Sequence, residues 1–123
     1  MRTYREAGVD IDRGDRFAAY IGSLRSRAVS RGLGGFAGGI EVDTGRYTHP
    51  VVLSTTDGVG TKLLVAKKLE RYDTVGIDLV AMCVNGLIVC NAEPVSFLDY
   101  IACGGVNESI LHPLMDGILR GCE

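Results

Sequence analysis

The chain lacks tryptophan and has only three prolines and two histidines in 123 residues. His49 and His112 lie far apart in sequence, and neither has a partner at the spacing of zinc ligands, which argues against a zinc site. An excess of charge is also missing, because thirteen Lys and Arg oppose fifteen Asp and Glu and leave a formal net charge of −2. We therefore expect no broad basic surface for nucleic acid or for an anionic membrane, and any anion site must be local.

Paired cysteines and long apolar runs are absent too. The four cysteines include no Cys-x-x-Cys pair, and we interpret them as small core residues of a reduced, cytoplasmic protein. The most apolar stretch, residues 75–92, is interrupted by Asp78, Asn85 and two glycines. We expect neither a secretion signal nor a membrane span.

Hydrophobic residues make up 46% of the chain, enough for the core of one domain over residues 1–123. Apolar spacing of three and four predicts an amphipathic helix over residues 12–30, a short helix over Lys62–Leu69 and a last helix starting at Asn107. A long, deeply buried helix is predicted from Val75 to about Cys90, capped at Asp73-Thr74.

Three stretches have the composition of strands, namely residues 40–42, 51–55 and 95–102, with a polar turn near residues 43–45. The order of elements predicts an α+β fold in which a small mixed or antiparallel sheet is covered by helices. Such a sheet has edges that need cover, so dimerisation is expected.

Residues 54–62 read Ser-Thr-Thr-Asp-Gly-Val-Gly-Thr-Lys and combine groups that suit a metal-bound triphosphate. Glycines let backbone N–H groups approach phosphate, Lys62 supplies a cation, and Asp57 is a hard oxygen ligand for Mg²⁺. A plain hairpin turn at Asp57-Gly58 is an equally good interpretation. The spacing of the glycines fits neither a P-loop nor the dinucleotide-binding fingerprint.

Asp78 and Asn85 are seven residues apart and so share one stripe of the long predicted helix. They are either site residues or a helix-dipole partner and an amide bonded to nearby backbone. Asp99 shares a strand face with apolar residues, and we expect it to be paired or functional.

Six blocks in order resemble the phosphoribosylformylglycinamidine cyclo-ligase family, also called aminoimidazole ribonucleotide synthetase. The blocks cover residues 4–12, 32–36, 56–62, 76–85, 92–94 and 97–100, and the first of them contains Ala-Gly-Val-Asp-Ile-Asp at residues 7–12. The resemblance implies a purine-biosynthesis ligase that uses ATP and Mg²⁺ to activate the formyl amide oxygen of formylglycinamidine ribonucleotide, which then closes to aminoimidazole ribonucleotide. It also implies an N-terminal ATP-binding domain whose sheets join across a homodimer, without the family's C-terminal domain, so we expect this chain alone to be inactive.

By position, the resemblance makes Asp57 and Asp78 metal and phosphate-site groups and Lys62 a phosphate partner. It makes Gly34, Gly35, Gly58 and Gly60 the backbone cradle, with Thr61 and Asn85 in support, and it assigns no catalytic residue. Carboxylates, a metal and a lysine on a preorganised backbone are what phosphoryl transfer requires.

One departure affects this site. Where the family usually reads Val-Asn-Asp-Leu, residues 84–87 read Val-Asn-Gly-Leu, so one acidic group is missing. We expect Asp in place of Gly86 to strengthen Mg²⁺-dependent binding. The alternatives are a non-catalytic dimerising module and another ATP-dependent relative of the selenophosphate synthetase or thiamin-phosphate kinase type.

Overall fold

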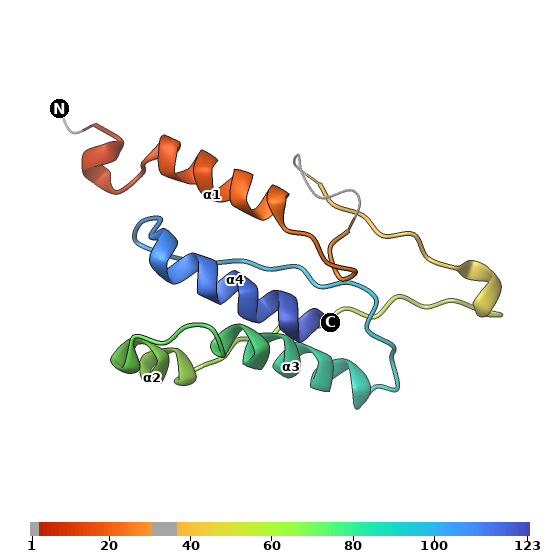
Figure 1. Cartoon of the computed structure of the whole chain (residues 1–123). Helices are drawn as coiled ribbons and strands as arrows, with labels where there is room; N and C mark the ends of the chain where they lie inside the picture. Colours follow the sequence, from red (N-terminus) through yellow and green to blue (C-terminus); the bar gives the residue numbers. More distant parts are fainter. Residues whose placement is uncertain (1–2, 31–36) are drawn as a thin grey trace.

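The computed structural model describes residues 3–30 and 37–123, in which helices alternate with long extended connections (Figure 1). The α-helices in this part of the chain are α1 Ile11–Ser23, α2 Lys62–Leu69, α3 Val75–Ile88 and α4 Glu108–Cys122. Short 3-10 turns form at Arg5–Ala7 and Thr44–Arg46. All four predicted helices are confirmed, although α1 ends at Ser23 and not at Ser30.

The ends of the helices follow local side-chain chemistry. The Asp10 carboxylate accepts a hydrogen bond from the Arg13 amide and caps α1, and the Asn107 side chain caps α4 by accepting from the Ser109 amide. The N-cap position of α3 is Thr74, as predicted, but the Thr74 side chain makes no capping hydrogen bond. The Asp73 carboxylate instead lies 3.0 Å from Nε of Arg71.

The core forms where α3 crosses α4 at close range. A Cβ atom on Gly76 would lie 2.5 Å from backbone atoms of α4, so only glycine allows this approach. The buried apolar side chains around the crossing are Val75 and Val80 from α3, Leu111 and Ile118 from α4, and Ala66 from α2. The expectation that α3 is deeply buried holds for one face only, because 58% of Ile88 is exposed.

The predicted sheet is wrong. Within residues 3–30 and 37–123 no strand is present, and no backbone hydrogen bond joins residues 40–42, 51–55 and 95–102 to one another. β-branched residues favour an extended backbone, but a ladder also needs a second segment about 4.8 Å away in register. Side chains join these segments instead of a ladder. The Tyr47 hydroxyl and Arg46 both bind the Glu93 carboxylate, at 3.0 and 3.1 Å.

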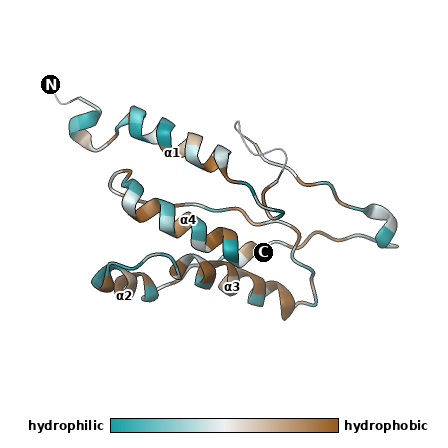
Figure 2. Cartoon of the chain, in the orientation of Figure 1, coloured by the Kyte–Doolittle hydropathy of each residue, from teal (hydrophilic) through white to brown (hydrophobic). Residues whose placement is uncertain are grey.

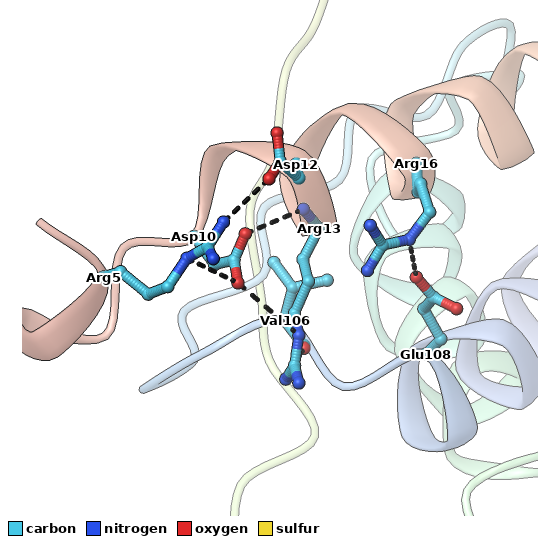
Figure 3. A network of polar contacts seen from close by, with 7 residues as sticks. All are labelled: Arg5, Asp10, Asp12, Arg13, Arg16, Val106 and Glu108. Atoms are coloured by element: carbon cyan, nitrogen blue, oxygen red, sulfur yellow. Dashed lines mark hydrogen bonds and ion pairs between the residues drawn. The ribbon is translucent and has the colours of Figure 1, made fainter.

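Helix α1 lies beside α4 and is attached to it mainly by polar contacts. Arg16 Nε lies 3.0 Å from the Glu108 carboxylate, and Arg13 donates a hydrogen bond to the carbonyl oxygen of Val106 just before α4 (Figure 3). Farther along, the Tyr20 ring stacks on His112 with centroids 3.7 Å apart. No residue of α1 is buried, so this helix depends on charge and on aromatic stacking more than on buried apolar area.

The cysteine interpretation needs a correction. All four cysteines are free thiols, but Cys90 and Cys103 are exposed and are not core residues. Among the residues that the structure describes, no helix is long and apolar enough to cross a membrane.

Candidate nucleotide site

The glycine-containing segment ends in a turn that starts α2. Gly60 adopts a positive φ of 56°, a conformation that glycine accepts without strain. The Lys62 amide then donates to the carbonyl oxygen of Val59 at 3.2 Å, and Thr61 occupies the cap position without a side-chain hydrogen bond. The turn therefore leaves the exposed Thr61 hydroxyl and the Lys62 side chain at the first turn of α2.

Lys62 and Asp78 meet in the structure. The Lys62 ammonium lies 3.1 Å from a carboxylate oxygen of Asp78, which belongs to the first turn of α3. Their side chains are 51% and 44% exposed. An exposed ion pair of this kind contributes only about 0–1 kcal/mol, so a phosphate can replace the carboxylate as the lysine's partner at little cost.

The backbone of Asp57 contacts α3. Its carbonyl oxygen lies 3.9 Å from the Cys83 thiol, which is near the middle of α3. One oxygen of its carboxylate accepts a hydrogen bond of 2.7 Å from the Gly58 amide, and the Asp57 side chain is otherwise exposed. The Gly58 N–H is thus occupied by Asp57, and it would have to exchange partners to bind a phosphate oxygen.

The other predicted residues have different positions. Asn85 lies on the stripe of Asp78, two turns farther along α3, and is exposed. Gly34 and Gly35 lie outside the described residues. Asp99 is on the extended connection, where partial burial raises the pKa of its carboxyl group. Burial, and secondarily Asp99 itself, raises the pKa of the Cys122 thiol.

The donor set suits Mg²⁺ held together with a nucleotide. Among the described residues, no three His, Cys, Asp or Glu side chains cluster to form a metal cage. Mg²⁺ usually keeps several waters and takes one or two carboxylates plus phosphate oxygens, and Asp57 and Asp78 could supply those carboxylates. The chemistry of these residues therefore fits the implied metal and nucleotide.

The contact of residues 54–62 with Cys83 is not predicted by the sequence. No local signal predicts it, because residues 57 and 83 belong to different elements and the cysteine lies in an ordinary apolar helix pattern. The contact matters because it holds the Asp57 backbone against α3, the helix that also carries Asp78.

The chain is similar to known proteins along nearly its whole length. Three relatives, each named phosphoribosylformylglycinamidine cyclo-ligase, match 98% of this chain. The proteins of Leptospira interrogans serovar Lai, Thermosynechococcus vestitus and Rippkaea orientalis are 48%, 51% and 52% identical to it. The chain spans 37%, 36% and 36% of their respective lengths. A family model described as AIR synthase related protein, N-terminal domain, matches residues 41–123, and this chain belongs to that family.

Proposed function

We propose that this chain is the N-terminal, nucleotide-binding part of a cytoplasmic, ATP-dependent cyclo-ligase that converts formylglycinamidine ribonucleotide to aminoimidazole ribonucleotide in de novo purine biosynthesis. The names of the relatives, and their identity of about half over nearly the whole chain, support this reaction. The chain spans little more than a third of their length, so the activity belongs to the longer protein.

The observation that carries the proposal is the pairing of Lys62 with Asp78 beside the Gly60 turn. It brings an exposed cation and an exposed carboxylate together next to a glycine with a positive φ. These are the groups that neutralise and position a triphosphate bound with its metal.

Each residue then has a role of its own. Lys62 binds a phosphate oxygen, and Asp57 and Asp78 hold Mg²⁺ through their carboxylates. The backbone of Gly58 and Gly60 lies along the phosphate groups and forms their cradle. Bound ATP with Mg²⁺ supplies the phosphoryl group that activates the formyl amide oxygen.

Two further groups support these contacts. The Thr61 hydroxyl lies at the start of α2, and the Asn85 amide lies on the stripe of α3 that carries Asp78. The substrate needs groups outside these 123 residues, so this chain alone binds nucleotide without turning over.

A homodimer is part of the proposal. The chain exposes 9698 Å² of surface, whereas a folded monomer of 13.1 kDa exposes roughly 6,400 Å². Much of the excess is apolar: Val52 is 78%, Leu98 87% and Tyr100 89% exposed. The extended connections are coloured as hydrophobic along much of their length (Figure 2). Surface of this kind marks a protein interface, and we assign it to a second copy of the chain.

Isothermal titration of ATP with and without Mg²⁺ tests the nucleotide site. We expect binding that strengthens with Mg²⁺ and weakens when Lys62 is replaced by Ala. Absence of binding at millimolar ATP would reject the proposal in favour of a non-catalytic module. Activity of the full-length protein as a selenophosphate synthetase or a thiamin-phosphate kinase, and not as a cyclo-ligase, would reject the assigned reaction.

A further inference from the structure

The segment that carries the proposed nucleotide site lies along α3 in a defined register. Its first contact joins Thr55 to Gly86, near the end of α3, and its second joins the Asp57 carbonyl oxygen to Cys83, about one turn earlier. The ion pair described above is the last contact, at the first turn of α3. Because residue numbers rise along the segment and fall along the helix, the segment runs antiparallel to α3.

The contact between Thr55 and Gly86 is close enough that a side chain at position 86 would require Thr55 to shift. A Cβ atom built on Gly86 would lie 3.1 Å from Oγ1, 3.6 Å from Cγ2 and 3.8 Å from Cβ of Thr55. The favourable separation of non-bonded carbon and oxygen atoms is about 3.5 Å or more. Thr55 would therefore have to move by a few tenths of an ångström. Removing Oγ1 and Cγ2 would leave only the contact of 3.8 Å, which is ordinary.

We propose that Thr55 and Gly86 are a size-matched pair that sets the register of residues 55–62 on α3, with Thr55 acting as a positioning residue for Asp57. Thr55 is only two residues before Asp57. If a side chain at position 86 displaces Thr55, the Asp57 backbone should therefore move as well and its contact with Cys83 should change. The register concerns the folded chain itself, and only its effect on nucleotide affinity rests on the proposed function.

The contact between Thr55 and Gly86 changes the effect on Mg²⁺ affinity that we expect from an acidic residue at position 86. On sequence grounds alone, Asp there adds a metal ligand and strengthens Mg²⁺ binding. In this structure its Cβ atom would meet Thr55 first, so Gly86→Asp disturbs the segment that holds Asp57. We therefore expect Gly86→Asp to gain Mg²⁺ affinity only when Thr55 is also made smaller.

A simpler explanation of Gly86 is that it is merely a weak position in a helix. Alanine favours a helix interior over glycine, so this explanation predicts that Gly86→Ala stabilises α3 and leaves the site unchanged. The size-matched pair predicts that the same substitution displaces Thr55 even if the helix itself becomes more stable. The two explanations therefore differ in what happens at Cys83 and at the nucleotide.

The experiment compares this chain with Gly86→Ala, Thr55→Ala and the double variant. Gly22→Ala in α1 is the control, because a Cβ atom there meets nothing within 4 Å. The alkylation rate of Cys83, read by mass spectrometry at that site, reports the register without any nucleotide. Calorimetric titration with MgATP reports the site.

We expect Gly86→Ala to raise the Cys83 alkylation rate severalfold and to weaken MgATP binding about tenfold, the equivalent of one well-directed interaction. The double variant should return both values to near those of the unchanged chain, and Gly22→Ala should alter neither. If Gly86→Ala does not fold, Thr55→Leu overfills the same contact from the other side and should give the same result.

Unchanged Cys83 labelling in Gly86→Ala, or failure of the double variant to reverse the change, would overturn the pair. If the unchanged chain shows no MgATP binding, the proposed function fails separately. The labelling pattern still decides the register in that case.

Discussion

The ammonium of Lys62, at the first position of α2, lies 3.1 Å from the carboxylate of Asp78 in the first turn of α3. This pair joins two elements that otherwise touch at few points, and it does so beside the positive-φ Gly60. Both partners are about half exposed, so the pair contributes little to stability and is open to exchange with a ligand.

Replacement of Lys62 by Ala should therefore separate binding from folding. We expect MgATP affinity to fall about tenfold, through loss of one charge-assisted contact, while the free energy of unfolding changes by less than about 1 kcal/mol. Calorimetry and urea unfolding measure the two quantities. Lys67→Ala, on the same helix but in its last turn, is the control and should change neither. An unfolded Lys62→Ala variant would mean that the lysine is structural.

Asp78→Asn should have a different signature, because Asp78 is assigned to the metal. We expect ATP without Mg²⁺ to bind at least as well as before, since an anion facing the phosphates is removed. The strengthening that Mg²⁺ adds should be largely lost. Titrations with and without Mg²⁺ measure this difference, with the exposed Asp12→Asn as control. Full retention of the Mg²⁺ effect would place the metal elsewhere.

Tyr20 links α1 to α4 and should make stability depend on alkaline pH. Partial burial, and next its hydrogen bond to Asp116, raises the pKa of Tyr20 to about 12. A raised pKa means that the folded state favours the neutral phenol. Its contribution is therefore complete below pH 10, the ordinary value, and is lost as the pH rises toward 12.

Unfolding by urea at about pH 9 and pH 11 tests this dependence. Between these pH values the unchanged chain should lose about 1 kcal/mol more stability than Tyr20→Phe, after allowance for solvent screening. Tyr4→Phe is the control, because Tyr4 is 77% exposed. Equal losses in the chain and in Tyr20→Phe would contradict a role for this phenol.

The proposed dimer predicts a polar substitution that breaks it. Glu in place of Val52 would place a charge in the interface and should weaken dimerisation by at least about tenfold. Sedimentation velocity over a range of concentrations measures this. Leu64→Glu is the matched control, because Leu64 is 67% exposed but belongs to α2 and not to an extended connection. Similar effects of both substitutions, or of neither, would argue against this interface.

The helices were predictable from sequence because their signals are local. Spacing of three and four places α1, and the caps Asp10 and Asn107 need only a residue three or two positions away. The extent of α1 was less predictable, since apolar Leu24 and Ala28 continue the pattern after the helix ends at Ser23.

The sheet was not predictable in the same way. Residues 51–53 have the β-branched and leucine composition of a strand, but composition reports only the preference for an extended backbone. Pairing depends on which segments meet in space, and within the described residues these meet no ladder partner.

The site was partly predictable. Seven-residue spacing correctly placed Asp78 and Asn85 on one stripe, but it gave no partner for either. The ion pair with Lys62 and the contact of Asp57 with Cys83 depend on how α2 and the extended segment fold back on α3. The packing of Thr55 on Gly86 depends on the same approach, which sequence spacing does not encode.

Amide hydrogen exchange of the chain with and without MgATP locates the residues that contact the nucleotide. If nucleotide phosphates bind where Lys62 and Asp78 meet, exchange should slow at residues 57–62 and in the first turn of α3. It should remain unchanged in α1. Nucleotide that binds without slowing exchange at residues 57–62 would show that the site lies elsewhere.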